Sequence, residues 1–533
     1  MRKILYVTVF CFALMLAGCA GGDSSSQQGQ TEDTSSKAEG TSNGVPGKDI
    51  GQEGNEVPVI AIETVSKEAN AMDFVTLPTA KHVAKSIASW NHGYTIPPEP
   101  YYEACTVTVT DTAGKVTVDN APAQVKVRGN WTTKNDKKPL RIKFDEKQPM
   151  LTMNGGAELK NWLLLAEYKD ISMLRNKTAF QLAKELYAED GFYCSDAMFV
   201  EVTINGEYWG MYLLAEQQQI NKDRVNITKA EEGYTGTDIG YLMEYDGYFN
   251  NEDKLNQFLC SYNGNAELVP FDGKGGSGKT HKPLVTEELV GVSIKSDIYS
   301  QEQHDFIASF VNNAYKIMYE AAYNDKAYAF NESYTEIAET DKLTPEEAVR
   351  AVVDVNSLAE IYILEELACD ADIYWSSFFF DVDFGEGGAK KLVFEAPWDF
   401  DSALGNKDRC PKGEGFYCAN IIYDVNGQYR FINPWLSVLM YEDWYTDIIR
   451  EKWTAAYDSG VFDRAYEMIE KDSTELEAVF TRNYDRWDNI RHNDDAGEWC
   501  ARAKACKTEK EAADYLSEWL GWRVDFLNSY WHK

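Results

Sequence analysis

The chain has 533 residues and a formal net charge of −34, because its 86 Asp and Glu residues outnumber its 52 Lys and Arg residues. This charge excludes a nucleic-acid-binding protein that acts through a basic face. Hydrophobic residues make up 44% of the chain and aromatic residues 13%, which is too much for a disordered acidic protein. The six His residues argue against a multi-His metal site and leave a carboxylate-based metal site open.

The N-terminus has the pattern of an export signal. Arg2 and Lys3 precede an apolar run over 4–17, which is too short to span a bilayer and ends in Leu-Ala-Gly-Cys at Cys19. This ending resembles the bacterial lipobox. We therefore expect residues 1–18 to be a lipoprotein signal peptide and Cys19 to carry the lipid. The protein would then be exported and anchored on the extracytoplasmic face of a membrane.

Residues 19–57 are rich in Ser, Gly and Thr and contain no aromatic residue. Such a composition cannot offset chain entropy by burial, so a flexible tether is expected. An oxidising compartment would permit disulfides among the eight later cysteines. The pairs Cys410/Cys418 and Cys500/Cys506 are the simplest local pairings, although the sequence leaves the connectivity open.

The first part of the folded region, residues 58–285, is expected to be rich in β-strands. Alternating patterns predict strands over 106–110, 123–127 and 139–144, the last with Arg141 and Lys143 on its polar face. Helical spacing predicts a helix over 173–189. A hairpin is expected over 199–216, because Asn205-Gly206 is the strongest short turn signal.

The second part, residues 286–533, is expected to be mainly helical. No low-complexity linker separates the two parts, so we expect one unit with two lobes. Helical periodicity predicts helices over 301–323, 344–353, 357–368, 463–483 and 510–530.

One motif is set aside. Residues 273–280 match the spacing of a Walker phosphate-binding loop, which would indicate a nucleotide hydrolase. Such a loop must lie between a buried strand and a helix, whereas Pro270 and Pro283 flank this one. A Gly/Lys surface loop is the preferred interpretation.

Acidic residues flank a predicted β-hairpin that turns near Glu386-Gly387. Folding this hairpin would bring Asp372 and Asp399 to one end, beside Asp370 and Asp401. Phosphoryl transfer uses such an arrangement, with one Asp at the acceptor hydroxyl and another at a magnesium ion. The alternative is that these acids only cap turns. Their mutual repulsion would then need a nearby cation.

Several separated motifs, in the expected order, resemble the spore-coat kinase (CotH) family of atypical protein kinases, which phosphorylate Ser in proteins. The resemblance implies an α+β, atypical protein-kinase-like fold, with a β-rich nucleotide-binding N-terminal lobe (58–285) and a mainly helical C-terminal lobe (286–533). The motifs are 128–131, 137–144, 170–176, 205–216, Asp372, and 398–401 followed by Gly405.

The same resemblance implies roles for single residues, with ATP and Mg²⁺ or Mn²⁺ as cofactors. Asp372 would be the catalytic residue. Ser377 would be a metal ligand at a position where many kinases carry Asn. For two of the nucleotide-binding candidates a structural role is the alternative: Arg128 could stabilise a turn, and Glu216 could be a structural residue. The expected metal ligands are Asp399, Asp401 and Ser377, and the expected nucleotide-binding residues are Lys143, with Lys138 as the alternative, Arg128 and Glu216.

Two hypotheses of function follow. The first is an exported, lipid-anchored kinase that phosphorylates Ser or Thr of a surface or coat protein. Its protein substrate is expected to be basic, because the chain is acidic, and to be Ser-rich. Nucleic acid is not expected as a partner. The second is a non-catalytic, kinase-like binding or scaffold module on the cell surface, which Ser377 and the scarcity of external ATP favour.

Overall fold

The computed structural model describes residues 55–273, 290–370, 372–407, 410–423, 430–488 and 499–533, and the backbone of 284–285. The expected signal peptide, the lipidation residue Cys19 and nearly all of the expected tether lie outside these residues. So do residues 274–280 of the Gly/Lys loop. Within the described residues, no helix is both long enough and apolar enough to cross a membrane.

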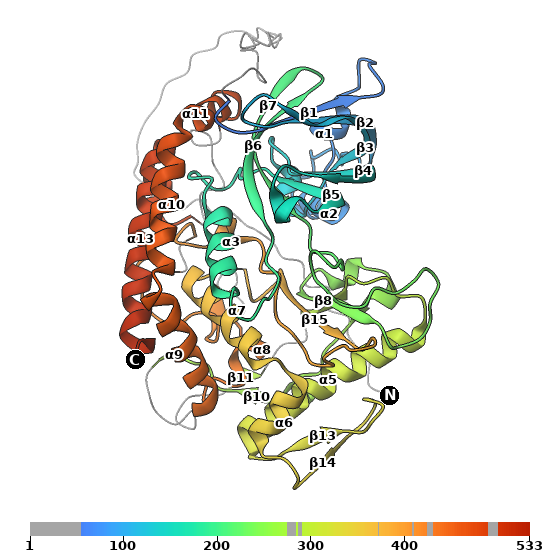
Figure 1. Ribbon diagram of the computed structural model, residues 1–533, viewed down its shortest axis with the longest axis vertical. Helices are drawn as coiled ribbons and strands as arrows, with labels where there is room; N and C mark the ends of the chain where they lie inside the picture. Colours follow the sequence, from blue (N-terminus) through green and yellow to red (C-terminus); the bar gives the residue numbers. More distant parts are fainter. Residues whose placement is uncertain are drawn as a thin grey trace, which may run out of the picture.

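Seven strands close into a barrel, at the upper right of Figure 1. Neighbouring strands are antiparallel except at the closure, where β1 runs parallel to β6 and Val59 pairs with Glu201. The order around the barrel is β1 (Val59–Thr64), β2 (Glu103–Thr110), β3 (Val116–Val127), β4 (Leu140–Pro149), β5 (Glu158–Leu165), β7 (Glu207–Glu216) and β6 (Ala197–Ile204).

Alternation of side chains explains the barrel strands. In β4, Leu140, Ile142 and Phe144 are buried in the apolar core of the barrel. Arg141 and Lys143 lie on the opposite face, as the period of two requires. The strands predicted from alternation over 106–110, 123–127 and 139–144 are confirmed.

The hairpin of β6 and β7 turns at Asn205 and Gly206, as predicted. Their φ angles are 51° and 77°, the left-handed backbone that a two-residue hairpin turn needs and that Asn and Gly accept at little cost. The Asn205 side chain also accepts a hydrogen bond from the Thr64 backbone N–H at 2.9 Å. The turn is thereby attached to β1.

A second sheet lies below the barrel and takes strands from both sides of position 285. Its order is β15 (Phe378–Asp383), β8 (Gly240–Asp246), β12 (Gly291–Ile294) and β9 (Gln257–Phe258). The expected hairpin partner of β15 forms only an isolated bridge, between Asp381 and Val393. All six residues of β15 pair with β8 instead.

Most of the longer helices lie after position 285, and the predicted helices are confirmed. One predicted helix, 463–483, is divided in two at Leu476. The longer helices are α2 (Lys81–Trp90), α3 (Arg175–Leu186), α5 (Gln301–Asn324), α6 (Pro345–Val352), α7 (Val355–Ala368), α9 (Asp443–Asp458), α10 (Val461–Glu475), α11 (Glu477–Arg486) and α13 (Glu509–Trp531).

Short elements complete the fold. They are α1 (Asp73–Thr76), α4 (Tyr262–Asn265), α8 (Pro434–Ser437), α12 (Ala501–Ala505), the 3-10 turns η1 (Trp131–Lys134), η2 (Met153–Gly156), η3 (Phe249–Asn251), η4 (Lys254–Asn256) and η6 (Phe400–Ser402), and the two-stranded pairs β10 (Glu267–Leu268) with β11 (Leu284–Val285), β13 (Tyr328–Phe330) with β14 (Ile337–Glu339), and β16 (Ile422–Tyr423) with β17 (Arg430–Phe431).

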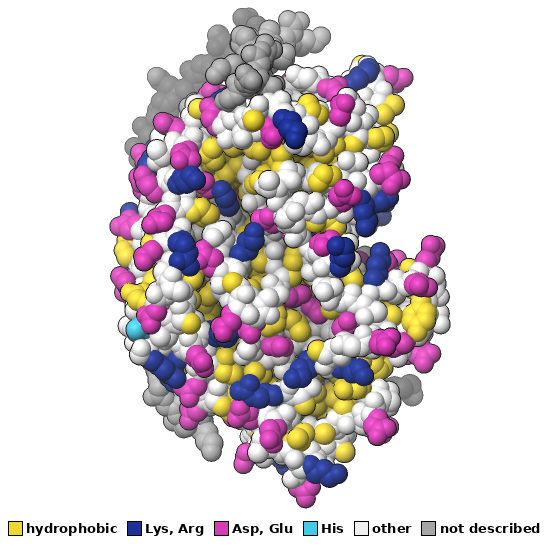
Figure 2. All heavy atoms as spheres, in the orientation of Figure 1, with side chains coloured by type: hydrophobic (Ala, Val, Ile, Leu, Met, Phe, Trp, Pro, Cys, Tyr) yellow, Lys and Arg dark blue, Asp and Glu magenta, His cyan; other side chains and the backbone are white. Residues whose placement is uncertain are grey.

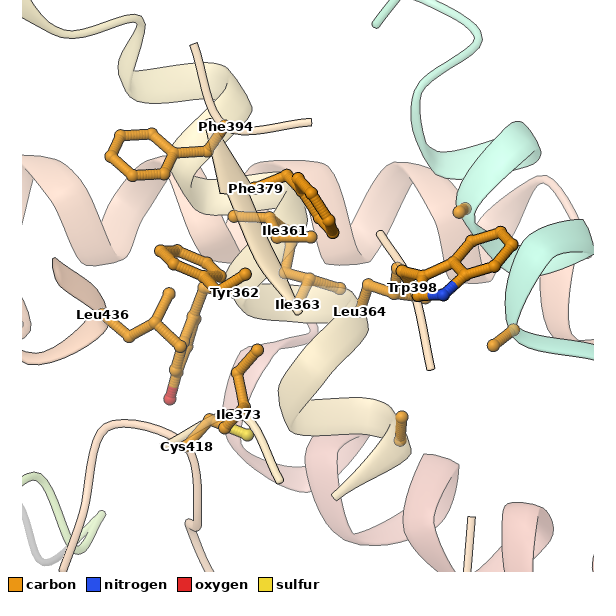
Figure 3. Close-up of a cluster of buried hydrophobic side chains, with 14 of the residues drawn as sticks. Ile361, Tyr362, Ile363, Leu364, Ile373, Phe379, Phe394, Trp398, Cys418 and Leu436 are labelled. Atoms are coloured by element: carbon orange, nitrogen blue, oxygen red, sulfur yellow. The ribbon is translucent and has the colours of Figure 1, made fainter. Parts of the chain in front are cut away.

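Helix α7 is the centre of the larger core. All its residues but Asn356 are buried, including Ile361, Tyr362 and Leu364. Figure 3 shows these side chains with Phe379, Phe394 and Trp398 from the segment that follows the helix. A helix that is buried on every side is held firmly by its neighbours, so α7 fixes the start of that segment.

The arrangement in Figure 1 places the barrel above the second sheet, with α3 and α7 in the middle and α9, α10 and α13 along the other side. Helices and sheets are both present, so the α+β class is confirmed. The two-lobed, kinase-like arrangement stays a prediction.

Candidate active site

Asp372 lies in the turn that follows α7. The helix ends at Cys369, whose φ of 47° reverses the chain. The backbone N–H of Asp372 donates to the Asp370 carboxylate at 2.9 Å, and the Asp372 C=O accepts from Trp375 N–H at 2.7 Å. The Asp372 side chain is one-third exposed, so solvent or an acceptor group can reach it.

Asp399 immediately precedes the short turn η6 and Asp401 lies within it, and distant elements hold this turn in place. Asp399 has a φ of 77°. The next N–H, of Phe400, donates to Asn176 Oδ1 of α3 at 2.8 Å. Leu404 N–H donates to Ala368 C=O at the end of α7, at 2.7 Å. The two carboxylates are therefore positioned by α3 and α7.

Ser377 joins these carboxylates to the second sheet. Its backbone N–H donates to Glu244 Oε1 of β8 at 2.9 Å, and its hydroxyl donates to Asp399 Oδ2 at 3.4 Å. The Lys295 ammonium from the segment after β12 lies 2.9 Å from Glu244 Oε2. Hydroxyl and carboxylate oxygens from β8, residue 377 and residue 399 thus meet at one place.

The carboxylates of this cluster repel one another. Burial raises the pKa of Asp399, and the charge of Asp372 raises it further, whereas Arg128 and Lys407 lower it. Burial and the charge of Asp399 raise the pKa of Asp401 to about 7. Lys407 lies 3.1 Å from Asp372 Oδ2. Further positive charge would therefore be favourable at this site.

The donor set suits a hard divalent cation. Magnesium is usually bound by one or two carboxylates together with water and substrate phosphate oxygens. Asp399 and Asp401 provide the carboxylates, and the Ser377 hydroxyl contacts Asp399. Among the described residues, no group of three or more His, Cys, Asp or Glu side chains is placed so that it could hold a metal ion. A site shared with substrate phosphates fits these residues, and an all-protein metal cage does not.

A pocket of about 750 Å³ opens between the barrel and the second sheet. Its polar wall includes the glutamines at 217–219, which follow β7. Dark blue side chains are visible near this boundary on the face shown in Figure 2. The basic residues that line the pocket are Lys126, Arg128, Arg141, Lys147, Lys160, Lys229 and Lys295.

The basic side chains of this pocket are crowded. Burial lowers the pKa of Lys126, and the charges of Arg141, Arg128 and Lys143 lower it further. An anion in the pocket would relieve this repulsion. A cavity of this size and charge can accept a polyphosphate.

Two residues belong to both the pocket and the carboxylate cluster. Arg128 lines the pocket, and its guanidinium lies 5.7 Å from the centre of the Trp398 ring, next to Asp399. Burial lowers the pKa of Arg128, and the charge of Asp399 raises it. Glu244 also lines the pocket and binds Ser377. The basic pocket and the carboxylates therefore form one continuous site.

The sequence profile of the family described as CotH kinase protein matches residues 125–527. The chain belongs to the CotH kinase family. A search of curated proteins found no match. The matched region begins in β3 and ends in α13, so it contains both Arg128 and the carboxylate cluster. The CotH family assignment supports a kinase-like protein and, in general, the use of ATP and a divalent metal.

The structure brings together five of the eight residues expected at the site: Arg128, Asp372, Ser377, Asp399 and Asp401. The other three, Lys138, Lys143 and Glu216, do not line the pocket.

Each of these three has a different environment. Lys143 is exposed on β4. Lys138 is buried and donates to the Asn135 C=O at 3.0 Å, which stabilises the η1 turn. Glu216 is buried and lies 3.1 Å from the Arg224 guanidinium.

Sequence reasoning missed Arg141, Glu244, Lys295 and Lys407. Arg141 is on the face of β4 that was expected to carry a cation, two residues before Lys143. Glu244 is an acid within the otherwise apolar stretch Tyr241–Tyr245, and that contrast could have identified it. Lys295 and Lys407 follow no motif that the sequence analysis recognised.

The eight cysteines of the described residues are free thiols in this structure. The expected pairs Cys410/Cys418 and Cys500/Cys506 are therefore not formed. Cys500 contacts the Tyr515 hydroxyl at 3.1 Å, and Cys506 donates to the Arg502 C=O at 3.3 Å.

Proposed function

We propose that this CotH-family chain is an atypical protein kinase that transfers phosphate from ATP to Ser or Thr of a surface or coat protein. The observation that carries the proposal is the continuity, through Arg128 and Glu244, of a polyphosphate-sized basic pocket with the Asp372, Asp399 and Asp401 carboxylates. A pocket for phosphates beside an acceptor-orienting carboxylate is what phosphoryl transfer needs.

In the proposed reaction, Arg128, Arg141 and Lys295 bind the phosphate chain in the pocket. Asp372 accepts a hydrogen bond from the acceptor hydroxyl. The hydroxyl oxygen then bonds to the γ-phosphorus, the bond from that phosphorus to the bridging oxygen breaks, and ADP leaves. The acceptor proton passes to the Asp372 carboxylate.

Asp399 and Asp401 would hold the divalent cation, with the Ser377 hydroxyl at Asp399. Bound Mg²⁺ or Mn²⁺ would supply charge neutralisation at the phosphates. Asn176 and Ala368 position these carboxylates through the backbone of 400–404.

Labelled ATP tests this function. The full chain in detergent, with Mg²⁺ or Mn²⁺ and a basic Ser-rich polypeptide, should transfer labelled phosphate, and Asp399→Asn should abolish transfer. Asp341→Asn, at an exposed position of the chain, is the control and should keep full activity. Transfer that persists at the wild-type rate in Asp399→Asn would contradict the proposal.

A specific observation favours the second candidate, a non-catalytic binding module. Ser377 stands where many kinases have an amide ligand, and a hydroxyl is a weaker ligand. Metal-dependent nucleotide binding without transfer to any acceptor would support a module that binds nucleotide. Absence of both binding and transfer would support a scaffold.

We also propose that the protein is exported and anchored through a lipid on Cys19. The apolar run over 4–17 and the Leu-Ala-Gly-Cys ending support this proposal. Fatty-acid labelling of the expressed chain should mark the wild type and not Cys19→Ala. Label retained in Cys19→Ala would contradict it.

A further inference from the structure

Lys407 lies among the carboxylates of the candidate site and has no role in the proposed reaction. Its ammonium donates to Asp372 Oδ2 at 3.1 Å and to Asp372 Oδ1 at 3.5 Å. Its positive charge also lowers the pKa of Asp399 and of Asp401, against the effect of burial. The described lining of the basic pocket does not include Lys407. This cation therefore belongs to the carboxylate half of the site.

The backbone just before Lys407 is held by distant parts of the chain. The Gly405 C=O accepts a hydrogen bond from the Tyr515 hydroxyl of α13 at 2.9 Å. The Asn406 C=O accepts from the Cys500 N–H at 2.9 Å, and the Asn406 side chain is only 3% exposed. The Lys407 side chain therefore starts from a fixed position, and rotations about its own bonds decide which anion it contacts.

Folding stability gives only a weak reason for the ion pair of Lys407 with Asp372. The two side chains are 19% and 33% exposed, and pairs that solvent can reach contribute little to stability. In phosphoryl transfer, by contrast, negative charge is spread over the three equatorial oxygens of the group in transit, and cations stabilise it there. A cation beside the acceptor-orienting carboxylate is close to these oxygens.

The reach of Lys407 fits such a contact. An acceptor oxygen lies about 2.6–3.2 Å from the carboxylate that orients it and about 3–3.5 Å from the phosphorus that it attacks, so the phosphorus is within about 7 Å of Asp372. The ammonium is already 3.1 Å from the same carboxylate. Rotations within the flexible lysine stem can cover the remaining distance while the backbone stays in place.

We infer that Lys407 is a catalytic residue that binds the terminal phosphate of a nucleoside triphosphate and leaves Asp372 to do so. This inference rests on the proposed kinase function and adds to it a discrimination between triphosphates and diphosphates. The cations of the pocket bind the phosphates that both nucleotides share, whereas Lys407 contacts only the third phosphate. Asp372 is then available to the acceptor hydroxyl once a triphosphate is bound.

Lys407 keeps its protons during the transfer and contributes hydrogen bonds and charge. The bond from the γ-phosphorus to the bridging oxygen breaks, the bond to the acceptor oxygen forms, and the acceptor proton passes to Asp372, as in the proposed reaction. When the phosphorylated acceptor leaves, the remaining diphosphate has no group for Lys407. The ammonium then returns to the Asp372 carboxylate, which is the arrangement seen in this structure.

Nucleotide titration tests the inference without catalysis. The full chain in detergent with Mg²⁺ is titrated with ADP and with the β,γ-imido analogue of ATP. We expect the wild type to bind the analogue more tightly than ADP. Lys407→Gln should weaken the analogue by about tenfold and change ADP by less than about twofold, because only one charge-assisted contact is lost. Equal affinities in the wild type, or equal losses for both nucleotides, would overturn the inference.

Two further variants separate phosphate binding from a purely structural role. Lys326→Gln, which removes the cation of an exposed pair with Glu339, is the matched control and should bind both nucleotides as the wild type does. Adding Lys407→Gln to Asp372→Asn should still cost about tenfold in affinity for the analogue. If the loss disappears in the Asp372→Asn background, Lys407 acts only through its pair with Asp372, and the inference fails.

Phosphate transfer from labelled ATP is measured separately, so that the kinase and the role of Lys407 can fail independently. Lys407→Gln should lower kcat by about 100-fold, because charge in the transition state loses a partner. A preference for the triphosphate that depends on Lys407, in a chain that transfers no phosphate, would refute the kinase and leave this binding role standing. Transfer by Lys407→Gln at the wild-type rate would refute the catalytic role of Lys407 alone. Binding of neither nucleotide would refute both.

Discussion

The basic wall of the site and its carboxylates have different kinds of support. Lys126, Arg141 and Lys160 stand on neighbouring barrel strands, where the backbone ladder and the alternation of side chains fix their positions. The carboxylates stand on turns between α7, β15 and η6. In that segment Cys369, Ser377, Lys390, Ala396, Asp399 and Leu404 all have positive φ.

The two halves of the site, the carboxylate half on the turns and the basic half on the barrel strands, therefore differ in the backbone strain that they contain. A positive φ in a residue other than Gly costs about 1 kcal/mol or more, and surrounding structure must maintain it. For Ser377, Asp399 and Leu404 that structure is Glu244, the Asn176 contact at Phe400, and Ala368. The carboxylate half should therefore depend on distant residues, and the basic half on its own strands.

The largest effect is expected for Asp372→Asn, which leaves both halves folded. Loss of a general base costs about 10²- to 10⁴-fold in kcat. The KM for ATP should stay within about threefold of the wild-type value, because the pocket on the barrel is unchanged. Steady-state kinetics check both values. A rise in KM with an unchanged kcat would place Asp372 in substrate binding instead.

Arg523→Met should damage the carboxylate half from a distance. Removal of one partner of a buried ion pair costs about 3–5 kcal/mol, because Glu366 would remain buried without its cation. Urea unfolding measures the loss. Hydrogen exchange should show lost protection at 410–415 and at the end of α7, with the barrel strands still protected.

The matched control for this variant is Arg502→Met, which breaks the exposed pair with Glu518. It should cost less than about 1 kcal/mol. Equal loss of protection in the barrel and the carboxylate half of Arg523→Met would show that the two halves are not supported separately.

Arg128→Gln should weaken the basic half. Loss of a charge-assisted contact to phosphate should raise the KM for ATP by about 10- to 100-fold. Lys143→Gln removes a charge of the same sign that does not line the pocket, and should stay within about threefold of the wild type. Isothermal titration with a non-hydrolysable nucleotide checks both. Equal losses would mean that Lys143 also binds phosphate.

The smallest effect concerns pH. Burial and the charge of Asp170 raise the pKa of Glu509 from 4.5 to about 8. The folded state keeps the proton while the unfolded state has lost it, so stability falls as the pH rises from about 4.5 to 8. Glu509→Gln should unfold at a higher temperature than the wild type at pH 8.5.

Unfolding temperatures at pH 6 and pH 8.5 measure this effect, with the exposed Glu475→Gln as the control. The control should follow the wild type at both pH values. A Glu509→Gln variant with the same fall in unfolding temperature as the wild type would show that Glu509 is already ionised in the folded protein.

Local patterns predicted the barrel strands and most helices well. Alternation in 139–144 and the Asn205-Gly206 turn are signals within a few residues, so the sequence contains them directly. The closure of the barrel by β1 and β6 depends on residues far apart in the chain, and no local pattern reveals it. For the same reason β15 was paired with its nearest neighbour in sequence rather than with β8.

The carboxylates of the site were predicted more fully than its cations. Asp372, Asp399 and Asp401 stand in motifs whose order is recognisable. A cation was harder to predict, because several basic side chains can share the correct face of a strand while only some of them reach the pocket. Arg141 and Lys143 share the polar face of β4, and only the positions of the neighbouring strands show that Arg141 lines the pocket. Lys138 was expected to bind the nucleotide, but it is buried and its ammonium donates to the backbone carbonyl of Asn135.

The parallel pairing of β1 with β6 has a consequence for biosynthesis. Val59 is made long before its partner Glu201, and at about 5–20 residues per second the ribosome needs on the order of ten seconds to reach it. During that interval one edge of β1 has no partner and is open to aggregation. A chaperone or translocation machinery that keeps the nascent chain unfolded until Glu201 has emerged would protect it.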